Sequence, residues 1–229
     1  MCAKAKDKMQ KPYYQDSAVT IYHGDCREIV PQLGRFDLLL TDPPYGIGES
    51  KKASVRTNSA KPDERWRCRV PTNYEYSEWD SELVDNETIK MLIAASSFQI
   101  IFGGNYYQLP PTKCWLVWDK ENGANDFADC ELAWTNFNKA VRRIKYLWNG
   151  FQKARPEERY HPTQKPLSVI KWAMNHAPDS TKTILDPFAG SGTTGRAAKD
   201  LNKTAVLIER EERYCEIAAS RMSQEVLAL

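Results

Sequence analysis

Four consecutive residues, Asp42-Pro43-Pro44-Tyr45, carry the groups needed to hold a planar amine. The Asp42 carboxylate can accept a hydrogen bond, and the two prolines fix the direction of a second acceptor, the Pro43 carbonyl. Tyr45 offers an aromatic face on which a nucleobase can stack, worth about 1–3 kcal/mol. Two acceptors directed at an exocyclic amine favour a tetrahedral nitrogen and expose its lone pair to an electrophile. Such a reaction requires no covalent intermediate with the protein.

A second group of residues, Gly190-Ser191-Gly192-Thr193-Thr194-Gly195, has the pattern G-x-G-x-x-G. Its glycines let the backbone turn sharply and approach a ligand, and the free N–H groups at a helix start attract an anion. Glu209 follows Gly190 by 209 − 190 = 19 residues, where a carboxylate can accept both hydroxyl hydrogens of a ribose. NAD and S-adenosylmethionine both present such a ribose, and both stay open at this point.

Both groups follow short apolar runs that alternate with amphipathic stretches, the pattern of a sheet covered by helices. We therefore predict an α/β fold in which residues 36–41 form a buried parallel strand that ends at Asp42. The carboxyl ends of such strands are where ligands bind. The other predicted strands are 19–22, 98–102, 114–118, 130–134, 144–148, 183–185 and 204–208, and the predicted helices are 27–33, 83–97, one from Pro166, one up to about Leu201 and one from about Glu211.

Composition and charge narrow the class of protein. With 229 residues, 41% hydrophobic and 27% charged, the chain is predicted to be one globular domain. Six cysteines without a C-x-x-C pair favour neither a zinc site nor a disulfide framework, so we expect no metal and a reducing compartment. No signal peptide or apolar run of about 18 residues is present, so we expect a cytoplasmic protein without a membrane partner.

The net charge is only +2, but Lys and Arg gather in two segments, 51–69 and 139–159, each with a local charge of +5. This asymmetry is compatible with a polyanionic partner. Residues 46–80 have little periodicity, and a loop of that length in a compact domain is usually functional or disordered.

Taken together, the motifs resemble those of the amino-group DNA methyltransferases, which methylate adenine N6 or cytosine N4. Asp42-Pro43-Pro44-Tyr45 resembles their catalytic motif. Residues 186–193, Asp-Pro-Phe-Ala-Gly-Ser-Gly-Thr, resemble their cofactor motif, and residues 161–166, His-Pro-Thr-Gln-Lys-Pro, resemble a third motif that precedes it. Catalytic motif first and cofactor motif last is the order of the beta class. The resemblance implies a Rossmann-like, S-adenosylmethionine-dependent sheet with helices on both faces and permuted motif order.

The resemblance also implies roles for single residues. Asp42, Pro43, Pro44 and Tyr45 would bind the flipped base, Lys165 would pair with the cofactor carboxylate, and Glu209 would hold its ribose. Asp25 and Cys26 match the position that contacts the adenine ring of the cofactor. The complete set expected to bind the cofactor is Asp25, Cys26, Asp42, Thr163, Lys165, Asp186, Phe188, Gly190, Gly192, Thr193 and Glu209.

Target recognition departs from the family pattern, because only residues 138–160 occupy the place of a usually long recognition region. We expect Arg142, Arg143 and Lys145 to contact DNA phosphates, residues 46–80 to act as a mobile clamp, and the sequence specificity to be short or relaxed. In the family, Asp at the first catalytic position goes mostly with adenine N6, so adenine is the favoured target and cytosine N4 the alternative. The target base must leave the helix or already be single-stranded.

Three alternatives remain. An NAD-dependent oxidoreductase would use residues 190–195 but leaves residues 42–45 unexplained. A non-catalytic nucleic-acid-binding protein would retain DNA without methylating it. RNA in place of DNA also stays open. Since dimers are common among similar enzymes, a homodimer in a bacterial or phage-infected cell is a further expectation.

Overall fold

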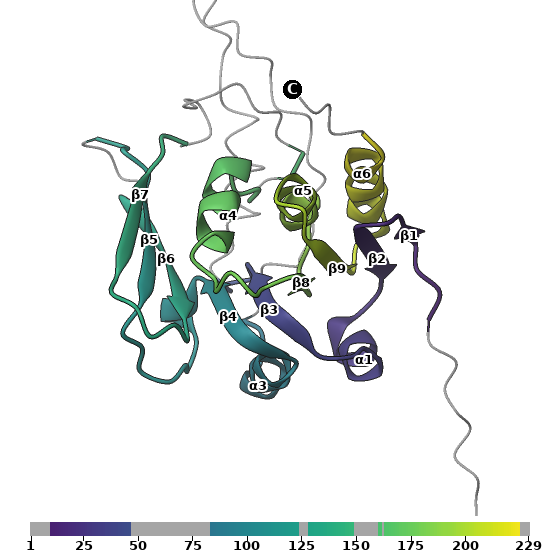
Figure 1. The fold of residues 1–229 in the computed structure, drawn as a ribbon, viewed down its shortest axis with the longest axis horizontal. Coiled ribbons are helices and arrows are strands. Elements are labelled where there is room, and N and C mark those ends of the chain that lie inside the picture. Colours follow the sequence, from purple (N-terminus) through teal and green to yellow (C-terminus); the bar gives the residue numbers. More distant parts are fainter. Residues whose placement is uncertain (1–9, 47–82, 124–127, 149–159, 162, 225–229) are drawn as a thin grey trace, which may run out of the picture.

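One mixed sheet with helices on both faces forms the centre of the protein (Figure 1). The computed structural model describes residues 10–46, 83–123, 128–148, 160–161 and 163–224. The strand order is β1-β2-β9-β8-β3-β4-β6-β5-β7, and in the described residues only β1 and β6 run against the others. The strands are β1 (Tyr14–Gln15), β2 (Val19–His23), β3 (Phe36–Thr41), β4 (Ser96–Phe102), β5 (Trp115–Asp119), β6 (Cys130–Thr135), β7 (Arg142–Lys145), β8 (Thr183–Asp186) and β9 (Thr204–Glu209).

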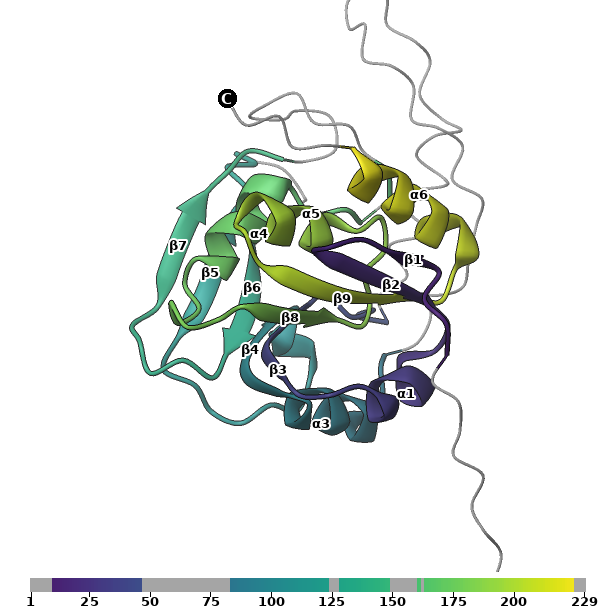
Figure 2. The same cartoon turned by 45° about the vertical axis from the view of Figure 1, so that its right-hand side comes forward.

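Helices cover the sheet in two layers that are visible from both directions of view (Figures 1 and 2). The helical elements are α1 (Cys26–Ile29), η1 (Val30–Gln32), α3 (Asn86–Ala94), η3 (Gly104–Tyr106), α4 (Leu167–Met174), α5 (Thr193–Asp200) and α6 (Glu212–Ser223). The helices α4, α5 and α6 pack on one face, while α1 and α3 pack on the other. The chain among the described residues contains no helix with the length and apolar character to cross a membrane.

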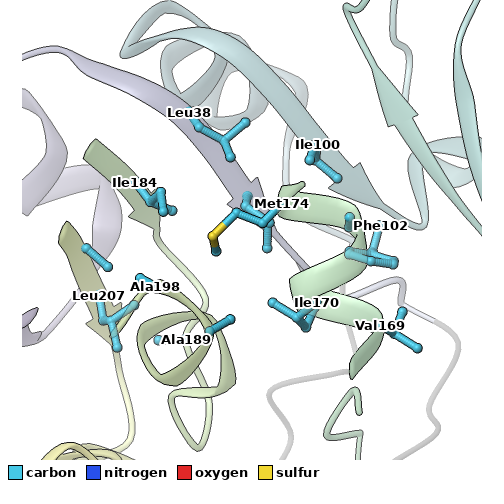
Figure 3. Close-up of a cluster of buried hydrophobic side chains, with 14 of the residues drawn as sticks. Leu38, Ile100, Phe102, Val169, Ile170, Met174, Ile184, Ala189, Ala198 and Leu207 are labelled. Atoms are coloured by element: carbon cyan, nitrogen blue, oxygen red, sulfur yellow. The ribbon is translucent and has the colours of Figure 1, made fainter. Parts of the chain in front are cut away.

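The central strand β3 is apolar because both of its faces are covered. Leu38 and Leu40 point to the layer of α4 and α5, whereas Leu39 points to the layer of α1 and α3, and all are at most 1% exposed. Figure 3 shows Met174 of α4 inserted toward Leu38 and Ile184 from the neighbouring strand β8. Full burial of each such side chain stabilises the fold by about 1.5–3 kcal/mol. This packing holds the ends of β3 and β8 beside each other.

The boundary between β3 and β8 is the switch point of the sheet. From β3 the chain continues through α3 to β4 on one side, and from β8 it continues through α5 to β9 on the other. Because α3 and α5 lie on opposite faces, a crevice opens at the carboxyl ends of β3 and β8. The Asp42 motif follows β3, and the glycine-rich turn follows β8.

The reversed strand β6 brings further residues to the carboxyl edge of the sheet. Since β6 is antiparallel to both β4 and β5, its first residues lie where those two strands end. The start of β6 is therefore beside the same crevice.

The predicted strands are all present, with some different limits. The strand expected at 144–148 is found earlier, at Arg142–Lys145, because these residues pair with Leu116–Asp119 of β5 at the exposed edge of the sheet, where arginines remain in water. The helix expected at 83–97 ends at Ala94, since Ser96 already begins β4. Nearly all of the loop expected at 46–80, and residues 149–159 of the expected recognition segment, lie outside the described residues.

Candidate active site

A cavity of about 540 Å³ lies at the carboxyl edge of the sheet, where the two motifs meet. Asp42 and Pro44 line it from the end of β3, while Asp186 and Gly190 line it from the end of β8. The Thr41 hydroxyl donates a hydrogen bond of 3.0 Å to the Asp186 carboxylate, which joins the two strand ends directly. The volume falls within the range of about 300–1,000 Å³ that is usual for small-ligand sites. Residues far apart in the sequence thus form one pocket.

The turn after β3 is held by hydrogen bonds on both sides. The Tyr45 hydroxyl donates to Asp42 Oδ1, and the Tyr107 hydroxyl donates to the Pro44 carbonyl at 2.5 Å. The Tyr45 ring stacks on Tyr106 with centroids 5.0 Å apart and an interplanar angle of 21°. A side chain at Gly103, whose φ is +65°, would overlap the Tyr45 ring. The glycine therefore leaves the space that the catalytic-motif tyrosine occupies.

A buried ammonium group lies next to Asp42. Lys165 Nζ lies 2.5 Å from Asp42 Oδ2 and 3.0 Å from Glu131 Oε2, and the lysine side chain is 7% exposed. Glu131 Oε1 also pairs with Lys120 Nζ at 2.6 Å. Two lysines and two carboxylates therefore alternate in a row of four charged groups that begins at Lys120, next to the end of β5, and ends at Asp42.

Burial and charge set the ionisation of these four groups. Burial raises the pKa of the Asp42 carboxyl, Lys165 opposes the rise, and the charge of Glu131 adds to it. Burial also favours protonation of Glu131, but Lys165 and Lys120 outweigh it and lower its pKa to about 2. For Lys165, burial is outweighed by the two carboxylates, which raise the pKa of the ammonium. Among the residues that the structure describes, Glu131 pairs with two cations and Asp42 with one, so Asp42 is the carboxylate that takes up a proton more readily.

The glycine-rich turn brings backbone and carboxylate groups to the opposite end of the cavity. Glu209 Oε2 accepts a hydrogen bond from Gly190 N, and its Oε1 accepts one from Glu211 N, both at 2.8 Å. A carboxylate has about four lone-pair sites, so both oxygens keep capacity for ligand hydroxyls. Burial raises the pKa of Glu209, and burial likewise raises the pKa of Asp186 to about 6.

Within this turn, some residues pack against α6 and others line the cavity. Gly192 adopts φ +79°, and a Cβ there would lie 2.9 Å from the Ala218 side chain, so this glycine packs against α6. Thr193 begins α5 and lines the cavity with Phe188 and Gly190. Gly192 itself is therefore a packing residue.

Asp25 and Cys26 lie at the start of α1 on the cavity wall. The Asp25 carboxylate caps this helix by accepting from Arg27 N at 2.8 Å, and it pairs with the Arg27 guanidinium at 2.5 Å. Burial raises the pKa of the Cys26 thiol to about 12, so it remains protonated. Both residues are thus placed to contact a ligand by hydrogen bonding or packing rather than by thiolate chemistry.

Most of the predicted site residues meet in this cavity. Its lining includes Asp25, Cys26, Asp42, Pro44, Thr163, Lys165, Asp186, Phe188, Gly190, Thr193 and Glu209. Lys165, expected to pair with a cofactor carboxylate, instead contacts Asp42 and Glu131, and so a ligand carboxylate would have to compete with both. That expected role stays a prediction.

The three basic residues expected to contact DNA are on β7, outside the cavity lining. Successive side chains of a strand point to opposite faces, so Arg142 and Arg143 do not share one surface. Arg143 pairs with Asp119 at 3.7 Å, and Lys145 with Glu121 at 3.5 Å. In the described residues, Lys145 is at the end of β7 that lies toward the cavity edge, because β7 runs parallel to β5.

Glu131, Lys120 and Tyr106 were missed by the sequence analysis. The available signal was a charged residue, Glu131, within an otherwise apolar strand. Only the antiparallel pairing of β6 shows that this residue reaches the cavity edge. No cluster that could hold a metal ion occurs among the described His, Cys, Asp and Glu residues.

Comparisons with known proteins give a consistent result. Residues 108–220 match the family model N6_N4_Mtase, described as DNA methylase. The Type II methyltransferase M.ScaI of Streptomyces caespitosus is 26% identical across 99% of this chain and 88% of its own length. The Type II methyltransferase M.HinfI of Haemophilus influenzae is 27% identical across 94% of this chain and 71% of its own length.

Solved structures show the same fold. The M1.HpyAVI–SAM complex superimposes with a TM-score of 0.54 and 22% identity, covering 89% of this chain and 99% of that chain. The PvuII DNA methyltransferase, described as cytosine-N4-specific, gives a TM-score of 0.59 with 11% identity, covering 96% of this chain and 91% of that chain. The fold class expected from the sequence is confirmed, and these matches support the expected family and the expected cofactor.

Proposed function

We propose that this chain, an amino-group DNA methyltransferase, transfers a methyl group from S-adenosylmethionine to the exocyclic N6 amine of adenine in DNA. The chain is an enzyme, its substrate is DNA, and the reaction is amino-group methylation. The choice of adenine is our proposal. One observation carries the function: the ends of β3 and β8, joined by Thr41 and Asp186, open into the same cavity.

The residues around the cavity fit the cofactor. S-adenosylmethionine, when bound, supplies an electrophilic methyl group. We assign Glu209 to its ribose hydroxyls, because both carboxylate oxygens are fixed by backbone N–H groups and keep free lone pairs. Phe188 and Thr193 form the wall beside the glycine-rich turn, and Asp25 and Cys26 are assigned to its adenine ring.

The residues of the catalytic motif act on the target base. Asp42 accepts a hydrogen bond from the exocyclic amine and orients the nitrogen lone pair, and Tyr45 supplies the stacking surface. The hydrogen bond from Tyr45 to Asp42 keeps the carboxylate and the ring in a fixed relation. When the amine has reacted it must release a proton, and Asp42, whose pKa is raised by burial, can receive it.

Adenine is favoured over cytosine because the motif begins with Asp, which goes mostly with N6 methylation in the family. Cytosine N4 remains the second candidate, since one structure of this fold is cytosine-N4-specific. We further propose a short or relaxed recognition sequence, residues 46–80 as a clamp, residues 138–160 as the recognition segment, and a homodimer. An NAD oxidoreductase would leave Asp42 and Tyr45 without a role.

A product assay tests the proposal. The protein is incubated with methyl-labelled S-adenosylmethionine and with DNA or RNA of varied sequence, and the product is digested to nucleosides. Labelled N6-methyladenine from DNA is the expected product, whereas N4-methylcytosine would support the second candidate. Label only in RNA, or no label with any substrate, would contradict the proposal. Mapping of the modified sites then tests specificity, and a site with six or more fixed bases would reject a short recognition sequence.

A further inference from the structure

Glu131 comes from a part of the chain that neither motif includes. It is the second residue of β6 and pairs in register with Trp118 of β5, near the point where β5 ends. Because β6 is reversed relative to its neighbours, this position is at the carboxyl edge of the sheet. A glutamate in the interior of an apolar strand is therefore directed to the site of the proposed reaction.

The contacts of Glu131 connect it to Asp42 through one side chain. Lys165 Nζ lies 3.0 Å from Glu131 Oε2, 2.5 Å from Asp42 Oδ2 and 3.3 Å from the Tyr45 hydroxyl. The same ammonium lies 4.9 Å from the centroid of the Phe102 ring. Desolvating these charges is costly, and replacement of buried ion pairs by apolar residues is often neutral or stabilising. Stability alone is thus a weak reason for the arrangement.

We propose that Glu131 is a positioning residue for methyl transfer. Because Glu131 shares the Lys165 ammonium group with Asp42, it keeps the Asp42 carboxylate in place and able to accept the proton of the target amine. This inference rests on the proposed function. With Lys165 alone as a neighbour, Asp42 would form a simple ion pair and would be a weaker acceptor. Glu131 contacts the same ammonium group and offsets that effect.

Methylation of the amine releases one proton, which needs an acceptor in the site. The amine nitrogen forms a bond to the methyl carbon while the carbon–sulfur bond breaks, and the electron pair of that bond passes to sulfur. The nitrogen then carries a positive charge and must lose one proton, which Asp42 receives. Lys165 is already protonated, so it cannot take this proton.

Within the described residues, charged and titratable groups from several elements face Asp42. Lys165 precedes α4, Glu131 is on β6, Asp186 ends β8, and Tyr45 is in the same turn as Asp42. Lys120 acts from the end of β5 through Glu131, and Tyr107 lies near Tyr45. Glu131, with a pKa of about 2, remains ionised at neutral pH, so it acts as a fixed negative charge.

Two substitutions should move the pH dependence in opposite directions. Activity falls as the pH falls through the pKa of Asp42, because the protonated carboxyl cannot accept from the amine. Glu131→Gln removes a negative neighbour, so we expect the acidic limb of single-turnover kcat/KM to move to lower pH by about one unit. The single-turnover rate at neutral pH should fall about tenfold, since Asp42 becomes a weaker acceptor. Lys165→Met removes the positive neighbour, so its acidic limb should move to higher pH.

A matched control and a second variant keep the test decisive. Glu87→Gln removes an exposed glutamate that also pairs with a lysine, Lys90, and it should change neither the rate nor the pH profile. Lys120→Gln leaves Glu131 paired with Lys165 alone, and so its acidic limb should move to higher pH, by less than in Lys165→Met. If Glu131→Gln does not fold, Lys120→Gln decides the question. An unchanged limb in the folded variants, or a shift in the same direction for Glu131→Gln and Lys165→Met, would overturn the proposal.

A second measurement separates this inference from the proposed function. In carboxyl-labelled protein without DNA, carbon NMR follows the titration of Asp42 directly. Glu131→Gln should lower its midpoint even if the wild-type protein methylates no substrate. Methylation by the wild type with an unmoved Asp42 titration in Glu131→Gln would reject the role of Glu131 alone. A moved titration without any methylation would reject the proposed function alone.

Discussion

The Thr41 hydroxyl donates to the Asp186 carboxylate across 3.0 Å, although the two residues are 145 positions apart in the chain. Each residue directly adjoins one of the two motifs: Thr41 precedes Asp42, and Asp186 begins the segment that leads to Gly190. This hydrogen bond joins adjacent parallel strands, so the two motifs are brought together by the strand order.

The substitution Asp42→Ala should reduce methyl transfer by about 10³-fold or more, because it removes the acceptor that orients the amine. Cofactor affinity should stay within about tenfold, or about 1.4 kcal/mol, since the residues around the glycine-rich turn are unchanged. Single-turnover incorporation of labelled methyl groups and calorimetry with S-adenosylmethionine measure the two quantities. Wild-type activity in this variant would remove Asp42 from the mechanism.

The substitution Gly103→Ala should disturb the catalytic turn. Its φ of +65° is unfavourable for alanine, and the added methyl group would overlap the Tyr45 ring. We expect a loss of about 1–3 kcal/mol in the free energy of unfolding, together with lower activity as Tyr45 moves from Asp42. Gly34→Ala is the matched control, because a Cβ there has no atom within 4 Å among the described residues. Urea denaturation compares the variants, and equal stability of both would contradict the close contact at Gly103.

Substitution of the basic residues on β7 should affect DNA binding unequally. Since Arg142 and Arg143 point to opposite faces, Arg142→Gln and Arg143→Gln should not both remove a phosphate contact. The slope of log K against log salt should fall by about 0.9 in one variant and remain unchanged in the other. Lys182→Gln is the control, because Lys182 is exposed just before the first residue of β8, at the amino ends of the parallel strands and away from the cavity. Equal reductions for both arginines would contradict this geometry.

Stability should depend on pH through Asp16, which lies between β1 and β2. Burial alone would raise its pKa, but hydrogen bonds from Lys199, Ala18, Val19 and Tyr14 outweigh burial and lower the pKa from 3.8 to about 2. The ionised carboxylate is therefore favoured in the folded state, by about 2 kcal/mol above pH 4. This contribution is lost as the pH falls from about 4 to about 2.

The variant Asp16→Asn tests this contribution. It should be less stable than the wild type at pH 7 by about 2 kcal/mol, and the difference should shrink as the pH approaches 2. Urea denaturation at several pH values gives the comparison. A difference that does not change with pH would assign the effect to lost packing instead of charge.

The sequence predicted the elements next to the motifs well, for a physical reason. The strands β3, β8 and β9 are apolar runs that give way to Asp42, Pro187 and Arg210, where the chain turns along the cavity. Buried parallel strands must be apolar on both faces, so their limits are visible in composition. The resemblance then supplied the expected roles of the residues that follow them.

The ionic contacts that connect Asp42 to Lys165, Glu131 and Lys120 could not be predicted in the same way. A glutamate such as Glu131 in a strand usually faces water, and only strand order and direction bring it to Lys165. The same applies to Tyr106, which is 45% exposed and is identified only by its stacking on Tyr45. The limits of β7 were missed because an edge strand needs no continuous apolar pattern.

The direction of β6 divides the outer part of the sheet into two zones that differ in their tolerance of change. The connection from β5 to β6 begins at Lys120, which pairs with Glu131 near the start of β6, so a change at Lys120 reaches Asp42 through the ionic contacts of Glu131 and Lys165. The connection from β6 to β7, residues 136–141, is at the other end of these strands, one strand length away from the chemistry. Changes in that second connection should therefore leave the ionisation of Asp42 unchanged, even where they alter how the neighbouring recognition segment meets DNA.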